Sequence, residues 1–171
     1  MNVGSLIARH AQYRPHHTGV VFGNQRLSFW EFNQRINRLA NALLNLGVRK
    51  GDKVATILPN CLELLESYLA IIRIGAVIVP LSHLLRGKGL LNLLRDSDTS
   101  SVITSSCFAG ELNSIKPELK NISANRYLSI DKSEGYESYA ALTEAVSSEA
   151  PPWIEIRDDD RLAAGKFALA L

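Results

Sequence analysis

Two short apolar runs on either side of a helical segment constrain the fold of this chain more than any other sequence feature. The first run covers residues 54–58 and the second covers residues 76–79. Such nearly continuous apolar runs are typical of strands that are buried on both faces of a parallel sheet. The interval between them has helical spacing. A strand, a helix and a strand within about thirty residues predict a βαβ unit.

The helix between the two runs shows one apolar face. Leu65, Leu69 and Ile72 recur at helical spacing, which predicts that they are buried. Glu63 and Glu66 fall off this face, and we therefore expect them on the exposed side.

The clearest single helix precedes the first apolar run. Ser28 and Glu31 form the S-x-x-E pattern of a capping box, and Leu27 and Phe32 occupy the positions of a hydrophobic staple. Gly47 is expected to end the helix, because glycine adopts a left-handed conformation without steric cost. The buried face of this helix is predicted to consist of Phe32, Ile36, Leu39, Ala40, Leu43 and Leu46.

The N-terminal part is expected to hold a short helix and a hairpin. Residues 3–11 have amphipathic helical spacing, and Pro15 stops that helix. Residues 20–22 and 26–29 are interpreted as two strands around a turn at residues 23–24.

Weaker alternation continues after residue 81 and completes the fold class. A helix is predicted around Leu90–Leu94, whereas residues 112–119 stay undecided because Pro117 interrupts them. Two further strands, a last helix and a linker are predicted at residues 101–104, 126–130, 139–146 and 147–152. We therefore expect an α/β fold, a partial doubly wound sheet with βαβ units.

The charge balance and the hydropathy exclude several classes of protein. There are 19 Lys and Arg against 17 Asp and Glu, and the basic residues are interleaved with acids, so no nucleic-acid partner is expected. The most apolar stretch, residues 68–81, is too short to span a bilayer and contains Arg73 and Gly75. Residues 1–14 lack the apolar core of a signal peptide. We expect a cytoplasmic protein without a transmembrane segment.

The cysteines and histidines give no metal or nucleophile motif. Cys61 and Cys107 lack metal-ligand spacing and are interpreted as incidental thiols. His16 and His17 are adjacent and point to opposite sides of an extended chain, and His10 is expected at the surface. A ligand-binding role is weighed for His83, which follows a predicted strand at its carboxyl end, but a plain loop histidine is the preferred interpretation.

Two short segments have some phosphate-binding character. Gly87–Gly89, with Lys88 in the middle, precedes a predicted helix and could face an anion, yet the motif is short and a flexible loop is the favoured interpretation. Ser105 and Ser106 follow a predicted strand, and an exposed turn is favoured there.

Several motifs occur in the order and spacing of a known family. Residues 27–32 read L-S-F-W-E-F, residues 46–55 read L-G-V-R-K-G-D-K-V-A, residues 59–60 read P-N and residues 75–81 read G-A-V-I-V-P-L. This set resembles the start of the adenylate-forming acyl-CoA synthetases, the AMP-dependent synthetase and ligase superfamily. The resemblance covers roughly residues 3–160, which is the basis for a domain assignment of 1–160 as the N-terminal part of that domain and 161–171 as an atypical truncated tail.

The resemblance implies a function for the full-length family. Its members use ATP and Mg²⁺ to activate a carboxylic acid, fatty or aromatic, as an acyl-adenylate, and they then transfer the acyl group to coenzyme A. The large N-terminal domain of the family contains two α/β subdomains and a β-barrel, followed by a small C-terminal domain. This chain would be the opening part of the large domain.

Three departures from the family pattern limit what can be carried over. Ser82 stands where the family has Asn, and Lys88–Gly89 stands where the next helix usually opens with an acidic pair, so the positive charge opposes the helix dipole. After Asp160 the family has a Ser/Thr/Gly-rich phosphate loop that ends in P-K-G, whereas this chain reads R-L-A-A-G-K and stops at Leu171. The change after Asp160 is interpreted as a frameshift, a gene-model error or an artificial terminus.

These departures lead to a cautious assignment of the site. No catalytic, cofactor-binding or metal-binding residue of the family is assigned to this chain, and the fragment is expected to be inactive and to bind ATP, Mg²⁺ and coenzyme A at most weakly. The alternative is a non-catalytic partner-binding module, whose uncovered apolar surface would favour self-association. An unrelated nucleotide-binding protein ranks last, because residues 58–61 are not a Gly-rich turn.

Overall fold

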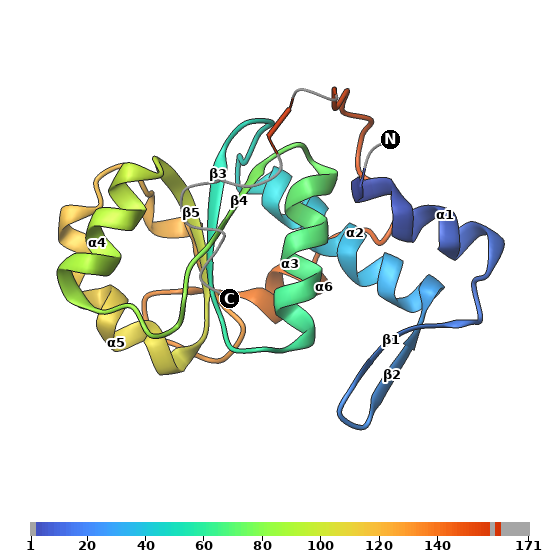
Figure 1. The fold of residues 1–171 in the computed structure, drawn as a ribbon, viewed down its shortest axis with the longest axis horizontal. Coiled ribbons are helices and arrows are strands. Elements are labelled where there is room, and N and C mark those ends of the chain that lie inside the picture. The colour runs from blue at the N-terminus through green and yellow to red at the C-terminus, as the bar shows by residue number, and fades with distance from the viewer. Residues whose placement is uncertain (1–2, 158–159, 162–171) are drawn as a thin grey trace.

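The computed structural model of the chain describes residues 3–157 and 160–161, which form three layers around a parallel sheet (Figure 1). Every neighbouring pair of strands in this five-stranded sheet is parallel. In spatial order, the strands are β4 (Val77–Pro80), β3 (Lys53–Ile57), β5 (Thr99–Thr104), β6 (Tyr127–Ser129) and β7 (Glu137–Ser138). A separate antiparallel hairpin is formed by β1 (Thr18–Phe22) and β2 (Gln25–Ser28).

The helices cover both faces of the sheet (Figure 1). One face carries α4 (Gly87–Asp96) and α5 (Ser106–Ile115). The other face carries α2 (Phe29–Asn45), α3 (Leu62–Arg73) and α6 (Tyr139–Glu144), with α1 (Leu6–Tyr13) and the hairpin beyond α2. Both faces are covered because a parallel sheet of apolar strands needs helices on each side. The α/β fold with a doubly wound arrangement is thereby confirmed.

The βαβ unit predicted from the two apolar runs is β3, α3 and β4. Ala55 in β3 pairs with Val79 in β4 on one side and with Val102 in β5 on the other. The chain therefore leaves β3 toward β4 and then crosses back to β5, which places the topological reversal between β3 and β5.

The ends of α2 agree with the sequence. The Ser28 hydroxyl accepts from the Glu31 N–H at 3.2 Å, and the Glu31 carboxylate accepts from the Ser28 N–H at 2.8 Å. Gly47 follows the helix with φ +85°, while the Val48 N–H donates to the Leu43 carbonyl. The predicted capping box and the glycine stop are both confirmed.

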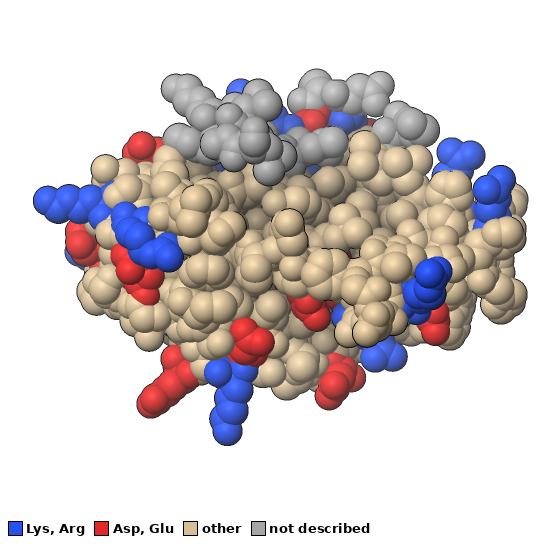
Figure 2. All heavy atoms as spheres, turned by 60° about the horizontal axis from the view of Figure 1, so that its bottom comes forward, with Lys and Arg blue, Asp and Glu red and all other residues tan. Residues whose placement is uncertain are grey.

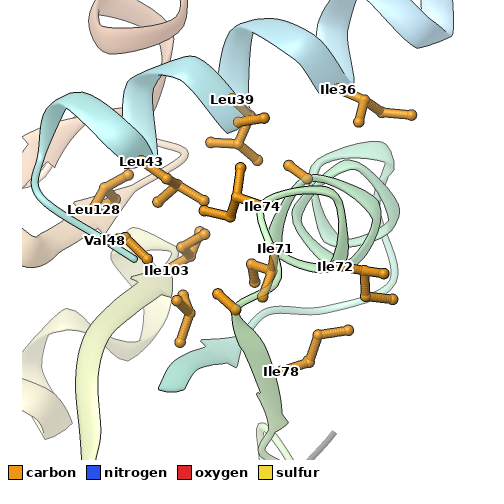
Figure 3. Packing of buried hydrophobic residues seen from close by; sticks show 14 of the residues in the cluster. Ile36, Leu39, Leu43, Val48, Ile71, Ile72, Ile74, Ile78, Ile103 and Leu128 are labelled. Atoms are coloured by element: carbon orange, nitrogen blue, oxygen red, sulfur yellow. The ribbon is translucent and has the colours of Figure 1, made fainter. Parts of the chain in front are cut away.

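Alternate strand residues face two separate apolar cores. On the α2 and α3 face, Ile36, Leu39 and Leu43 of α2 pack against Ile71 and Ile74 (Figure 3). On the α4 and α5 face, the main contributors are Ala55, Ile57, Val79, Leu90, Leu94, Val102 and Leu112. The period of two along β3 thus divides its side chains between the cores.

Two predictions for α3 are wrong, because Glu66 lies inside the protein and Leu65 is exposed. The exposed fraction of Glu66 is 1%, whereas Leu65 is 39% exposed. Glu66 tolerates burial because Arg35 from α2 and Tyr139 from α6 bind its carboxylate. Helical spacing alone could not show partners on two other helices.

The undecided region after β5 is also resolved. The helix α5 begins at Ser106 and ends at Ile115, and a 3-10 turn over Lys116–Glu118 follows it. Pro117 sits in the first turn of this 3-10 segment, where its missing N–H costs no hydrogen bond. The two-residue strand β7 was not predicted, since two residues carry no recognisable pattern.

Within 3–157 and 160–161, none of the helices is long and apolar enough to cross a bilayer.

Candidate functional site

The carboxyl edge of the sheet is the candidate site. Because all five strands are parallel, the loops after β3, β4, β5 and β6 emerge at the same edge. In open α/β sheets ligands bind outside the carboxyl ends of strands, at the point where the strand order reverses. Here that point lies between β3 and β5, so α3 and α5 start beside it on opposite faces.

The first turn of α4 holds the Gly87–Gly89 segment. These residues are the start of a helix and not a flexible loop, so that interpretation is corrected. The Gly87 N–H donates to Oε1 of Glu111, which lies on α5, at 2.6 Å. The first turn of α4 has no acidic residue of its own. Glu111 therefore supplies the negative charge that this helix end favours.

The first turn of α5 is arranged in the same way. Ser105 is 1% exposed and precedes the helix, so the predicted exposed turn is wrong. The Ser106 N–H and hydroxyl both donate to Oδ2 of Asp131, each at 3.2 Å. Asp131 comes from the loop after β6 and thus occupies the N-terminus of α5.

Two helix ends at this edge are consequently occupied by carboxylates of the chain itself. Helix N-termini attract phosphate through free N–H groups and a positive dipole end. At α4 and α5 these groups face Glu111 and Asp131, whose charges repel a triphosphate. In the part of the chain that the structure describes, no three His, Cys, Asp or Glu side chains cluster to hold a metal ion. A phosphate at either of these helix ends would have to displace Glu111 or Asp131.

The loop after β4 carries the departures from the family pattern. His83 is exposed, with its ring 6.2 Å from that of Phe108. The Arg86 guanidinium lies 6.0 Å from the Phe108 ring centre and donates to the His83 carbonyl at 2.6 Å. The Ser82 hydroxyl accepts from the Leu84 N–H at 3.2 Å, which makes it a turn residue here. The preferred interpretation of His83 as a plain loop histidine stays a prediction.

The other three histidines lie on the N-terminal part of the chain. The ring of His10 stacks on Phe29 with 4.8 Å between ring centres. His16 and His17 are exposed between α1 and β1.

The two thiols flank the topological reversal. Cys61 precedes α3 and is partly buried, and burial raises its pKa to about 11. Its thiol is thus protonated at neutral pH, which disfavours a nucleophilic role. Cys107 is exposed in the first turn of α5, with its Sγ 3.0 Å from the Ser105 hydroxyl.

A buried polar cluster links α2, α3 and α6 and was missed from the sequence. Glu66 Oε1 lies 2.5 Å from Nε of Arg35, and Glu66 Oε2 accepts from the Tyr139 hydroxyl at 2.7 Å. Burial and the Glu66 charge raise the pKa of Tyr139 well above its usual value. The phenol therefore remains a hydrogen-bond donor at neutral pH. The cluster fastens three helices, and no local pattern reveals it because the residues are far apart in sequence.

The end of the described chain is held at the opposite side of β3. Asp160 accepts from the Lys50 ammonium at 2.6 Å and from the Arg157 N–H at 2.7 Å. These hydrogen bonds, with that of Lys50 the stronger, lower the pKa of Asp160. Residues 162–171, where the atypical tail is predicted, lie outside the described residues.

The parallel sheet, its two helical layers and its carboxyl-edge loops define the N-terminal α/β domain of adenylate-forming enzymes. The sequence matches the AMP-binding enzyme family over residues 7–164, and the chain belongs to that family. The resemblance inferred from the motifs is confirmed.

Curated relatives and solved structures agree on this class. The chain is 39% identical over 100 residues to crotonobetaine/carnitine–CoA ligase of Escherichia fergusonii, which covers 58% of this chain and 19% of the relative. It superposes on a fatty acyl CoA synthetase of Mycobacterium tuberculosis with a TM-score of 0.85 and 25% identity, covering 95% of this chain and 32% of that one. The N-terminal domain of FACL13 from the same organism gives a TM-score of 0.83 at 25% identity, with 95% and 41% covered. The chain thus spans about a fifth of the curated relative.

Proposed function

We propose that this chain supplies the N-terminal part of an ATP-dependent acid–thiol ligase. The complete enzyme activates a fatty or aromatic carboxylic acid as an acyl-adenylate and passes the acyl group to coenzyme A. The family match over residues 7–164 carries this proposal. The names of the relatives support a coenzyme A ligase, and both fatty acyl and carnitine-type acids occur among them.

We also propose that the 171 residues alone are inactive and contain no catalytic, cofactor-binding or metal-binding residue of the reaction. The departure from the family pattern after Asp160 supports this, because residues 161–166 read R-L-A-A-G-K where the resemblance implies a Ser/Thr/Gly-rich phosphate loop. Residues 1–160 are assigned to the ligase domain and 161–171 to a truncated tail. A cytoplasmic location is proposed as well, since both cysteines are free thiols.

A chimera tests the ligase assignment. Residues 1–157 of this chain replace the matching N-terminal segment of the Escherichia fergusonii ligase, and acyl-CoA formation is measured with a panel of fatty, aromatic and carnitine-type acids. We expect coenzyme A- and ATP-dependent acylation. A folded chimera that forms no acyl-CoA with any of these acids, beside an active parent enzyme, would contradict the assignment.

A partner-binding role is the second candidate, and exposed apolar side chains favour it. Phe22 on the hairpin is 45% exposed, Trp30 on α2 50%, and Leu84 after β4 74%. Figure 2 shows a broad uncharged area with Lys, Arg, Asp and Glu scattered around it. Sedimentation velocity decides whether the chain self-associates. Concentration-dependent dimers that disappear in Phe22→Ser/Trp30→Ser would favour this role, and a strict monomer would count against it.

A further inference from the structure

A small pocket lies at the edge of the sheet opposite to the candidate site. Its volume is about 170 Å³, and its walls come from the first described residues, α2, the end of α3 and residues 150–154. Since α3 starts beside the carboxyl ends of the strands and runs back along the sheet, its last residue, Arg73, lies near their amino ends. The pocket is therefore separate from Glu111 on α5 and from Asp131 in the loop after β6.

Arg73 forms a polar wall of the pocket and is held in a fixed position. Its Nε and Nη2 donate to the Gly4 carbonyl at 3.1 and 3.0 Å, and its Nη1 donates to Oδ1 of Asn37. A guanidinium has five N–H groups. These three hydrogen bonds leave one N–H on each terminal nitrogen without an acceptor among the described residues, so two N–H groups can donate to one ligand.

The charge of Arg73 also lacks a counterion among the described residues. No Asp or Glu of residues 3–157 and 160–161 forms an ion pair with it, and its two acceptors, Gly4 and Asn37, are neutral. Burial lowers its pKa to about 10, so it stays charged at neutral pH. The C-terminal end of α3 contributes only a partial negative charge. Buried charges are normally paired.

The remaining walls are largely apolar. Ala8, Pro151, Pro152 and Trp153 line the pocket, and the Trp153 side chain is 86% exposed. The segment that carries these prolines is fixed through its backbone. Asn37 donates to the Ser148 carbonyl at 2.8 Å. Asn41 donates to the carbonyls of Ser147 and Glu149.

We propose that this pocket binds a small organic carboxylate with an apolar body. The carboxylate accepts from the two remaining N–H groups of Arg73, in the bidentate geometry that guanidinium and carboxylate share. The apolar body packs on the prolines and on the Trp153 indole. The volume suits one aromatic ring, since an apolar cavity of about 150 Å³ holds benzene. This site requires neither ATP nor coenzyme A and is independent of the proposed ligase function.

Benzoate binding tests the proposal through Trp153 itself. The Trp30→Phe variant leaves Trp153 as the only tryptophan, because the chain has two. Benzoate titrated into this variant of the full chain should change the Trp153 fluorescence in a saturable way. Benzyl alcohol, which has the ring but no charge, should bind at least about tenfold more weakly, because charge-assisted hydrogen bonds account for the difference.

Further substitutions in the Trp30→Phe background distinguish benzoate binding at Arg73 from nonspecific binding to arginine side chains on the surface. Arg73→Met should weaken benzoate binding by about tenfold or more, whereas Arg73→Lys should retain part of it. Arg9→Met, which removes an exposed arginine from α1 outside this pocket, should bind benzoate like its parent. Absence of saturable binding, equal binding of benzyl alcohol, or full binding by a folded Arg73→Met variant would overturn the proposal. If Arg73→Met does not fold, the comparison of benzoate with benzyl alcohol decides.

Discussion

The two faces of the parallel sheet are built differently. On the α2, α3 and α6 face, charged and polar groups lie inside the apolar core, with Glu66 1% exposed and Asn37 4% exposed. On the α4 and α5 face, the core holds no charged group among the described residues and its buried polar groups are hydroxyls, such as those of Ser97, Thr99 and Tyr127, while the carboxylates of Glu111 and Asp131 lie at the rim against helix ends. The first face is therefore specified by partners on several helices, and the second by apolar packing and end charges.

The difference matters for function. In the polar cluster around Glu66, side chains of α2 and α6 bind a carboxylate of α3, and these contacts hold the three helices against one another. The rim carboxylates, in contrast, occupy helix ends that could otherwise receive an anion. The chain thus combines three helices joined by buried polar contacts with two helix N-termini that its own carboxylates cap.

The largest expected effect is the loss of core packing, which should be equal on the two faces. Leu43→Ala on one face and Leu112→Ala on the other each remove a side chain with 0% exposure. Each substitution should lower the free energy of unfolding by about 3 kcal/mol through lost transfer energy and the cavity left behind. Urea denaturation followed by circular dichroism measures both. A loss much below that on only one face would show that this face is poorly packed.

The next effect should separate the faces through two phenol hydroxyls, that of Tyr139, which is buried, and that of Tyr136, which is partly exposed. Tyr139→Phe removes the donor to the buried Glu66 and should cost about 1–3 kcal/mol, because a charged acceptor is left without that partner. Tyr136→Phe is the matched control on the other face, where the phenol donates to the Ala109 carbonyl and to Asn113. It should cost about 1 kcal/mol at most. Equal losses in chemical denaturation would contradict the distinction between the faces.

The rim carboxylates should contribute less than either. Glu111→Gln and Asp131→Asn keep the side-chain size and remove the charge that faces α4 and α5. Each should lower the free energy of unfolding by about 0.5–1 kcal/mol, in line with charge–dipole interactions at helix ends, and salt should reduce the difference. Melting curves at low and high salt check this. Stabilisation by either substitution would show that the carboxylate is not a favourable cap.

The effect that is smallest at neutral pH concerns the thiol of Cys61, beside the reversal point. The pKa of Cys61 is raised from 9.0 to about 11, so the unfolded chain loses this proton first. The stability from Cys61 is therefore complete below pH 9 and declines as the pH rises toward 11. Cys61→Ala should flatten the decline of the urea midpoint in this range, and Cys107→Ala, at the exposed thiol, should not. Identical pH profiles for the two variants would contradict the assignment.

The sequence predicted features that depend on neighbours along the chain. The Ser28–Glu31 capping box, the Gly47 stop and the apolar runs of β3 and β4 are all local and were confirmed. The wrong predictions depend on distant partners. Glu66 is buried only because Arg35 and Tyr139 reach it from other helices.

Partners that are distant in sequence also explain the wrong predictions at the candidate site. Gly87–Gly89 was interpreted as a loop because its own residues favour one, and the stabilising Glu111 lies on the next helix. The occupied N-terminus of α5 was equally hidden, since Asp131 is 25 residues away from Ser106. The family motifs could be recognised because they are continuous stretches, whereas the charges that fill the helix ends are assembled only by the fold.

The most direct test of the central claim is ATP–pyrophosphate exchange by the purified 171-residue chain. A panel of fatty and aromatic acids is supplied, and a full-length ligase of the family in the same assay shows that the conditions support exchange. We predict no carboxylate-dependent exchange by the chain, because residues 161–166 read R-L-A-A-G-K where the family resemblance implies a Ser/Thr/Gly-rich phosphate loop. Carboxylate-dependent exchange above the protein-free background would contradict the account and would show that these 171 residues hold a working adenylation site.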